Sequence, residues 1–280
     1  MRSDSGGSLN FCIFYKNIIV IIMTTTSVIY KYVTVGAAKA ILNSNSIRFT
    51  PPNEFNDPFE FLPAGYSGVT KELIENKLTE PIYNSIISSN NRIINDKIVE
   101  MVTVKMVDPD ANIIRARQFV DGVSSIIGVC SLTKNNSNIL MWSHYASEHT
   151  GVVIGFDEGK LPNRAIKVIY DDVRPSIPFR PPTEEDAEVL AKTKYSKWSY
   201  EEEYRVLMAL NFCEPINDIS PGKIIYTKKL PDKAIVEVIC GCYTPQIEID
   251  EISIIAHTNN SNIGIKRASI NNTNYSMNIS

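Results

Sequence analysis

Three short segments of the chain carry carboxylates, cations and aromatic side chains at spacings that could do chemistry. The segments cover residues 48–60, 141–157 and 194–205. Such groups bind polar ligands and transfer protons when they lie close together. We therefore expect the three segments to meet at one polar pocket. At least four of seven side chains should line it: Arg48, Asp57, His144, Tyr145, Glu201, Glu203 and Arg205.

The last of these segments has the densest charge, with three consecutive glutamates at 201–203 followed by Arg205. A strand that begins near Glu203 would place Glu201, Glu203 and Arg205 on one face, because strand side chains alternate. Carboxylates so close together raise one another's pKa unless a cation lies among them, and Arg205 or Lys194 could be that cation. The group is either a structural ion-pair network or a catalytic carboxylate with its orienting partners.

The middle segment contains Trp142, Ser143, His144 and Tyr145, with His149 shortly after them. On a helix, Trp142 and Tyr145 are three positions apart and share a face. The two histidines lack the i, i+4 spacing of a helical metal pair, so we predict no metal site. They either hold backbone groups in the core or contact a polar ligand.

The first segment runs from a short strand into the Pro51-Pro52 turn and a second turn at 56–58. Proline and the Asn-Asp-Pro sequence favour tight turns over regular structure. One interpretation is a structural loop whose phenylalanines fill the core. The alternative is a loop that presents Arg48, Asp57 or Glu60 to the pocket.

The elements that must position these segments are mostly strands. Helices are predicted at 37–42, 113–127 and 183–192, the last with Thr183 as N-cap ahead of three acidic residues. Residues 70–127 have mostly helical periodicity and are interpreted as a helical insertion that covers the sheet. The chain is thus predicted to form a single α+β domain at 23–280, with a mixed or antiparallel central sheet. Runs of apolar and β-branched residues predict the strands at 27–33, 47–50, 128–132, 152–156, 165–170, 204–210, 223–226, 235–240 and 263–270, and the tail at 271–280 holds a last strand or is disordered.

Composition narrows the class of protein. The net charge of −3 leaves no basic excess for general nucleic-acid binding. Five cysteines are an odd number at sparse spacing, and we interpret them as reduced thiols that mostly fill the core. Reduced thiols favour a reducing compartment, so the expected location is the cytoplasm.

The N-terminal stretch at 11–23 is apolar, but Lys16 interrupts it and it is shorter than the roughly 20 residues of a membrane span. We interpret residues 1–22 as a mis-assigned start or a disordered extension, with Met23 as the start of the domain. A membrane anchor and an added strand or helix are the alternatives. No membrane association is expected for the domain.

The order of several motifs resembles a known family. The motifs are Tyr30-Lys31-Tyr32, the 48–60 segment, Cys130-Ser131-Leu132-Thr133, the run from Met141 to Ala146 with Gly155-Phe156-Asp157, and the run from Trp198 to Arg205. In this order they resemble the bacterial domain of unknown function 2971 (DUF2971), from about residue 27 to the C-terminus. The resemblance implies one domain and no particular activity.

A second resemblance, in motif order, is to ADP-ribosyltransferases. It matches Tyr30-Lys31-Tyr32 with a first-strand signature, the 142–145 region with a middle aromatic element, and Glu203 or Glu201 with a late-strand glutamate. The first strand lacks the histidine of one branch of that family, because Lys31 stands there, and no Ser-Thr-Ser element is present.

This second resemblance implies NAD as cofactor and a protein or nucleic acid as acceptor, in a bacterial toxin or phage-defence effector. Glu203, or Glu201, would stabilise the oxocarbenium-like transition state. Tyr145 or Trp142 would stack on nicotinamide. The remaining cofactor-binding residues would be Tyr30, Lys31, Arg48, Asp57 and Arg205, of which Arg48 or Lys31 would face the pyrophosphate.

Two other functions remain open from the residues alone. One is a hydrolase or nuclease-like effector that uses His144 with Glu201 and Glu203 as acid and base, or Lys194 with the two glutamates around a metal. The other is a non-catalytic module that senses a nucleotide or a peptide.

Overall fold

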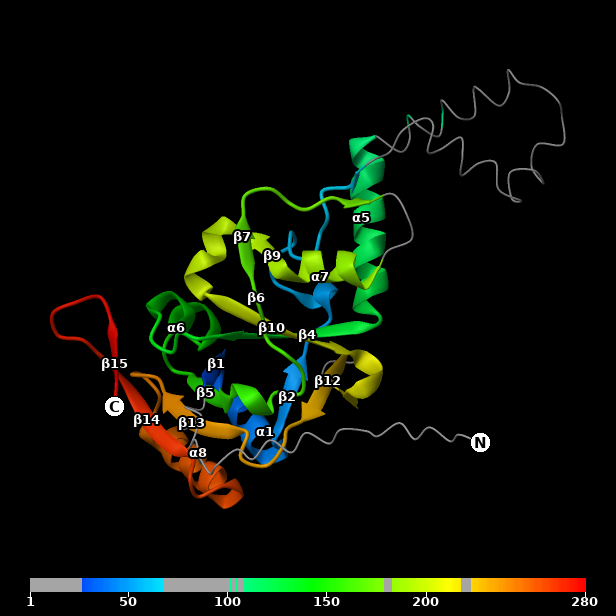
Figure 1. Cartoon of the computed structure of the whole chain (residues 1–280). Helices are drawn as coiled ribbons and strands as arrows, with labels where there is room; N and C mark the ends of the chain where they lie inside the picture. The colour runs from blue at the N-terminus through cyan, green and yellow to red at the C-terminus, as the bar shows by residue number, and fades with distance from the viewer. Residues whose placement is uncertain (1–26, 68–100, 102–103, 105–107, 179–182, 218–222) are drawn as a thin grey trace, which may run out of the picture.

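A mostly antiparallel sheet of eight strands runs through the computed structural model of the chain (Figure 1). The structure describes residues 27–67, 101, 104, 108–178, 183–217 and 223–280. The strand order is β15-β14-β13-β5-β1-β4-β10-β6, and within these described strands β13 and β14 form the parallel pair. The fold is α+β with a mixed central sheet, as the sequence predicts.

The strands of this sheet are rich in the β-branched and aromatic residues that favour a pleated, buried surface. Its central strand β1 pairs along its whole length with β5, from Val28 opposite Asp157 to Val33 opposite Val152. The sheet consists of β1 (Val28–Val33), β4 (Ile127–Thr133), β5 (Val152–Asp157), β6 (Ile166–Lys167), β10 (Glu203–Ala209), β13 (Ile235–Cys240), β14 (Gly264–Ile270) and β15 (Met277–Ile279).

Three smaller sheets lie around it. One contains β2 (Ser46–Phe49), β12 (Ile224–Lys229) and β11 (Glu214–Asn217). The others pair β3 (Tyr66–Ser67) with β8 (Ile177–Pro178), and β7 (Ile169–Asp171) with β9 (Thr193–Tyr195). The single strand predicted at 165–170 is wrong, because the chain leaves β10 at Val168 and β7 then joins β9 in a separate sheet.

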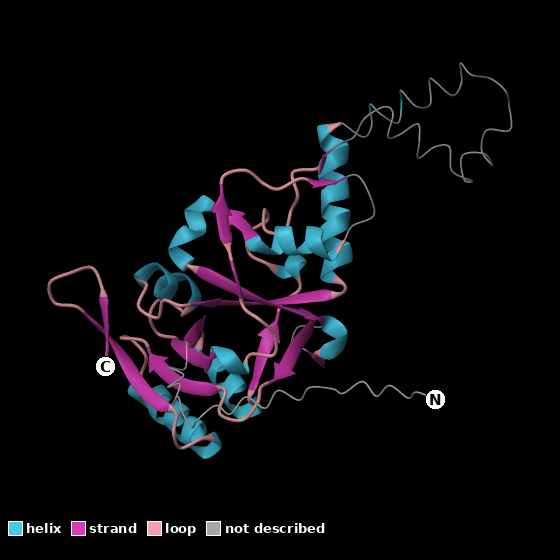
Figure 2. Ribbon diagram, viewed as in Figure 1, coloured by secondary structure: helices cyan, strands magenta, loops and turns pink. Residues whose placement is uncertain are grey.

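The helices cover the sheet (Figure 2). The predicted cap of α7 is confirmed: the Thr183 hydroxyl accepts from the backbone of Asp186, whose carboxylate accepts in return from the Thr183 N–H. Such a capping box satisfies backbone donors that a helix start leaves free. The described helices are α1 (Val35–Ser44), α5 (Pro109–Ser124), α6 (Ile139–Tyr145), α7 (Glu184–Lys192) and α8 (Gln246–Asn259), with 3-10 turns η1 (Pro52–Glu54), η2 (Glu158–Lys160), η3 (Ser196–Glu201) and η4 (Leu210–Phe212).

One predicted helix needs correction, and most of another predicted helical segment lies outside the described residues. The helix predicted at 113–127 begins earlier, at Pro109, and ends at Ser124, because the following residues enter β4. Most of the proposed insertion between 70 and 107, like the N-terminal segment 1–22, lies outside the described residues. The helix α8 was not predicted from the sequence.

The sheet separates three groups of buried apolar side chains. On one face Ile29, Ile154 and Val238 pack with residues of α1 and α8. The opposite face carries two groups, one around Trp142 of α6 and one around Phe61 with residues of α5 and α7. The polar side chains described below lie where the two groups of this second face meet.

The backbone at Gly241, just after β13, lies close to the backbone of His149, shortly after α6. A Cβ at Gly241 would lie 2.1 Å from the carbonyl oxygen of His149, whereas a Cβ at Gly36 in α1 would meet no heavy atom within 4 Å. We expect Gly241→Ala to lower the free energy of unfolding by about 1–3 kcal/mol, because backbone must shift to admit the methyl group. Gly36→Ala should leave it unchanged or raise it by up to about 1 kcal/mol. Urea unfolding of both variants checks the contrast, and equal effects would contradict it.

Candidate functional site

The centre of the site is a buried ammonium group. Lys194 follows directly on α7 in the short strand β9, and its Nζ lies 2.6 Å from an oxygen of Glu201, 3.0 Å from Glu203 and 3.5 Å from Glu60. All four side chains are at most 6% exposed. A lysine so deeply buried keeps its charge because three carboxylates surround it, and they raise its pKa above the usual value against the lowering effect of burial.

A second buried cation joins the same carboxylates. The guanidinium of Arg205, on β10, is fully buried and donates from Nε to Glu203 at 2.8 Å and from Nη2 to the other oxygen at 2.9 Å. Nη2 also pairs with Glu60, and Nη1 donates to the carbonyl of Ala191 at 3.0 Å. The bidentate geometry fixes Glu203 in one orientation. Together, Glu60, Lys194, Glu201, Glu203 and Arg205 are called the ion cluster below.

The sequence predicts the arrangement on β10 correctly. Glu203 and Arg205 share a face through the strand alternation, and Glu201, at the end of η3, reaches the same cluster. Glu202 between them has left-handed backbone dihedrals, is exposed, and accepts from the side-chain amide of Asn135. Both cations that the sequence offered as partners, Lys194 and Arg205, are used.

The charges of the ion cluster do not cancel. Three carboxylates face two cations, which leaves a formal surplus of one negative charge. Burial alone would raise the pKa of Glu203, but Arg205 and Lys194 outweigh it and hold that pKa at about 2. Burial raises the pKa of Glu60, and the same two cations only partly offset that effect. Of Glu60 and Glu203, Glu60 is therefore the one whose ionised form the two cations stabilise less.

A tyrosine orients the third carboxylate. Tyr145 on α6 donates its hydroxyl to Glu201 at 2.5 Å, while the other oxygen of Glu201 accepts from Lys194. Burial, and then the negative charge of Glu201, raise the pKa of Tyr145, so its hydroxyl stays protonated as a donor. Glu201 is thus held by α6 and by β9, and its partner Tyr145 lies 56 residues before it in the chain.

A cavity of about 120 Å³ opens beside the ion cluster. We call it the tyrosine cavity, because Tyr30 and Tyr32 of β1 and Tyr145 of α6 line it. Glu60, Glu201 and Glu203 also line it, as does Lys31, whose Nζ donates to the carbonyl of Ser131 at 3.0 Å. The three segments that the sequence singled out all contribute to its wall.

The tyrosine cavity contains fewer of the expected side chains than predicted. Of the seven residues expected to line one site, Tyr145, Glu201 and Glu203 do so. The prediction of at least four is therefore wrong. Arg205 lies behind Glu203 in the core and reaches the site only through its ion pairs.

Four predicted site residues lie away from the tyrosine cavity. Trp142 is fully buried against Tyr32, and its indole N–H donates to the carbonyl of Asn136, so its ring does not face a ligand there. His144 is exposed and pairs with the hydroxyl of Tyr200. Arg48 pairs with Glu54. Asp57 accepts from the indole of Trp198 at 2.8 Å.

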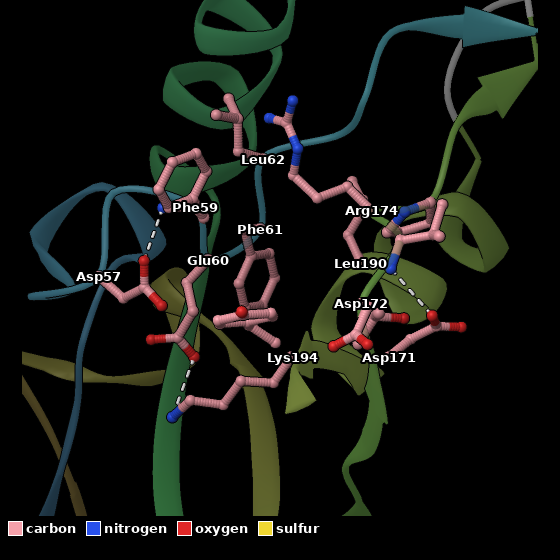
Figure 3. Close-up of a pocket in the computed structure, with 14 residues that line it drawn as sticks. Asp57, Phe59, Glu60, Phe61, Leu62, Asp171, Asp172, Arg174, Leu190 and Lys194 are labelled. Atoms are coloured by element: carbon pink, nitrogen blue, oxygen red, sulfur yellow. Dashed lines mark hydrogen bonds and ion pairs between the residues drawn. The ribbon is translucent and has the colours of Figure 1, made fainter. Parts of the chain in front are cut away.

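A second cavity, of about 370 Å³, lies on the other side of the ion cluster (Figure 3). We call it the phenylalanine cavity, since Phe59 and Phe61 line it with Leu62 and Leu190. Asp57, Asp171 and Asp172 supply carboxylates to its wall. Glu60 and Lys194 line both cavities, so this ion pair forms their common wall.

Glu60 and Lys194 emerge from the structure as more central than the sequence suggests. Glu60 lies between two phenylalanines in the chain, which is the only signal that it faces a core. Its partner Arg205 is 145 residues away, and no local pattern predicts such a pair. The sequence offers Lys194 as a possible cation among the glutamates, or as part of a nuclease-like cluster with Glu201 and Glu203, but not as the centre of the site.

The described ranges contain neither a metal-binding cluster nor a membrane-spanning helix. There, no group of three or more His, Cys, Asp or Glu side chains is arranged to hold a metal ion. Among those residues, no helix combines the length and the apolarity needed to cross a membrane. The four cysteines described, Cys130, Cys213, Cys240 and Cys242, are free thiols.

The comparisons with known proteins concern the segment that forms much of this site. No curated protein and no solved structure matches the chain. Residues 141–206 match the family model described as Protein of unknown function (DUF2971). These residues include most of α6, with Tyr145, and they also include Lys194 and the glutamates before and on β10. Over this segment the chain is similar to that family of unknown function, in agreement with the resemblance seen in the sequence.

Proposed function

We propose that the chain is an enzyme that cleaves the nicotinamide–ribose bond of NAD and transfers ADP-ribose to an acceptor. The observation that carries this proposal is the presence of three carboxylates, those of Glu60, Glu201 and Glu203, in the wall of the tyrosine cavity. Carboxylates held in place at a buried wall favour a ligand or a transition state that carries positive charge.

The chemistry of NAD supplies such a charge twice. Its nicotinamide ring is cationic before cleavage, and the ribose carbon becomes oxocarbenium-like as the bond breaks. Nicotinamide then leaves as a neutral molecule, with the electron pair of the broken bond. Glu201 is the group proposed to stabilise the ribose cation, because Tyr145 and Lys194 hold its carboxylate at the cavity wall.

The size of the tyrosine cavity supports a role for one end of the dinucleotide. Pockets that enclose a whole drug-sized ligand measure roughly 300–1,000 Å³. At about 120 Å³, the tyrosine cavity fits a single ring. The flanking rings of Tyr30 and Tyr145 suit an aromatic, cationic group.

The experiment that tests this function is incubation of the purified full chain with NAD, with and without cell lysate, in parallel samples labelled in the nicotinamide ring and in the adenine ring. We expect free nicotinamide to appear in proportion to the amount of protein, and ADP-ribose to become attached to a lysate component. Binding of NAD without release of nicotinamide would support the non-catalytic sensing alternative instead. If the chain neither binds NAD nor releases nicotinamide, the proposal is overturned.

The hydrolase or nuclease alternative has less support in the geometry. The ammonium of Lys194 occupies the position between the three carboxylates where a metal ion would bind. His144, the acid or base of that alternative, pairs with Tyr200 at the surface and does not line the tyrosine cavity.

A further inference from the structure

We propose that the phenylalanine cavity binds a free α-amino acid with a large apolar side chain, separately from the tyrosine cavity. Arg174 would hold the carboxylate of this ligand, Asp171 and Asp172 would hold its ammonium group, and the apolar part of the lining would receive its side chain. The inference goes beyond the proposed function, because it does not depend on NAD.

The first support is the size and the lining of the phenylalanine cavity. Its volume of about 370 Å³ lies within the roughly 300–1,000 Å³ of pockets that enclose a small ligand. Phe61, Leu62 and Leu190 give it an apolar lining, and each is at most 7% exposed. Such a lining favours an apolar side chain that leaves water. Because the pair of Glu60 and Lys194 forms the wall toward the tyrosine cavity, a ligand here stays on one side of it.

The second support is a buried guanidinium nitrogen without a partner. Nη1 of Arg174 is buried, and in the part of the chain that the structure describes it has no hydrogen-bond partner. The guanidinium lies 5.6 Å from the centroid of the Phe59 ring, and both side chains line the cavity. In Figure 3 it lies at the opposite end of the cavity from Lys194. A buried donor favours an acceptor oxygen that satisfies it, and the guanidinium fork matches a carboxylate.

The third support is a pair of exposed carboxylates on the same segment. Asp171 and Asp172 line the cavity and lie three and two residues before Arg174 in the chain. One oxygen of Asp171 accepts from the N–H of Val173 at 2.9 Å, and one oxygen of Asp172 accepts from the hydroxyl of Ser196. Among the described residues, the second oxygen of each has no hydrogen-bond donor. These two oxygens can therefore accept from an ammonium group.

The spacing of these charges indicates the class of ligand. In an α-amino acid, the ammonium and the carboxylate are bonded to one carbon atom, and their proposed partners come from the four residues 171–174. The carboxylate of Asp57 adds negative charge to the lining, although its two oxygens already accept from the N–H of Phe59 and the indole of Trp198. Arg174 could also pair with a phosphate. A phosphate carries more negative charge than a carboxylate, however, so the acidic lining disfavours it more strongly.

The test measures binding to the purified full chain by isothermal titration calorimetry. The probes are phenylalanine, 3-phenylpropionate, phenylalanine amide, alanine and phenyl phosphate. We expect phenylalanine to bind roughly tenfold or more tightly than each of the others, because 3-phenylpropionate lacks the ammonium group, the amide lacks the carboxylate, and alanine lacks the large side chain. Phenyl phosphate lacks the ammonium group and carries the larger negative charge.

Variants place the ligand in the phenylalanine cavity. Arg174→Gln should weaken the binding of phenylalanine by roughly tenfold or more and leave that of phenylalanine amide unchanged. Arg164→Gln, the same change at an exposed arginine outside the lining, should bind both probes as the wild type does. The double variant Asp171→Asn, Asp172→Asn keeps the oxygens that accept from Val173 and Ser196. It should lose the preference for phenylalanine over 3-phenylpropionate.

The outcomes decide the proposal in either direction. A wild-type chain that binds neither phenylalanine nor leucine nor tryptophan would overturn it. Tighter binding of phenyl phosphate than of phenylalanine would overturn the class of ligand. A folded Arg174→Gln protein that binds phenylalanine as the wild type does would overturn the place of the carboxylate, and if that variant does not fold, the order of the probes on the wild type decides. None of these measurements uses NAD, so this inference and the proposed function can each fail alone.

Discussion

A Glu203→Gln variant is expected to lose about 3–5 kcal/mol of the free energy of unfolding, as is usual when one partner of a buried ion pair is removed. Glu203 accepts from Arg205 through both oxygens and from Lys194, and its side chain is 4% exposed. The neutral amide would leave most of the buried positive charge of Arg205 to Glu60 alone. Urea unfolding followed by circular dichroism measures the effect.

Glu202→Gln is the matched control, because it makes the same chemical change at an exposed neighbour. It should alter stability by less than about 0.5 kcal/mol. A Glu203→Gln protein as stable as this control would show that the ion pairs of Glu203 do not hold the fold. Glu203 would then be free for a catalytic role, as the sequence first suggested.

The same ion pairs predict how stability depends on pH. The pKa of Glu203 is about 2 in the folded chain and 4.5 ordinarily, so the folded state holds its proton less readily. The resulting stability, on the order of 3 kcal/mol, is present above pH 4.5 and is lost as the pH falls toward 2.

Glu60 has the opposite effect on the pH dependence of stability. Its pKa is raised in the folded chain, so protonation of Glu60 at low pH favours the folded state. The wild type should therefore lose stability steeply below pH 4.5, and the Glu203→Gln variant much less so. Equal acid dependence in both proteins would contradict the assignment of this loss to Glu203.

Periodicity explains what could be predicted from the sequence. The alternation along β10 places Glu203 and Arg205 on one face, and the acidic residues after Thr183 mark the start of α7. Both features are local, since the residues concerned lie within a few positions of each other. Local patterns also indicated most strands of the sheet.

Long-range pairing explains what could not be predicted. The residues of α8 include five isoleucines, which favour strands, although Ile249, Ile252 and Ala256 have helical spacing. Trp142 illustrates a second difficulty, because an aromatic residue next to polar ones suits a core as well as a ligand site. Only the packing against Tyr32 decides between them. The place of Glu60 depends on a partner 145 residues away.

The change expected to have the largest effect on activity is Glu201→Gln. If the carboxylate of Glu201 stabilises the ribose cation, its neutral isostere should lower the rate of nicotinamide release by roughly a hundredfold or more, as when another preorganised electrostatic group is removed. The effect should fall on kcat more than on KM, because the charge of the ribose is largest in the transition state.

The stability of Glu201→Gln separates this effect from a structural one. Lys194 keeps its contacts with Glu203 and Glu60 in the variant, and Arg205, which pairs with Glu203 and Glu60, keeps both partners. We therefore expect a smaller loss of stability than in Glu203→Gln, and a larger loss of activity. Nicotinamide release and thermal unfolding, measured on both variants and on Glu202→Gln, test this reversed order. If Glu201→Gln stays folded and releases nicotinamide at the wild-type rate, the carboxylate of Glu201 is not the group that stabilises the transition state.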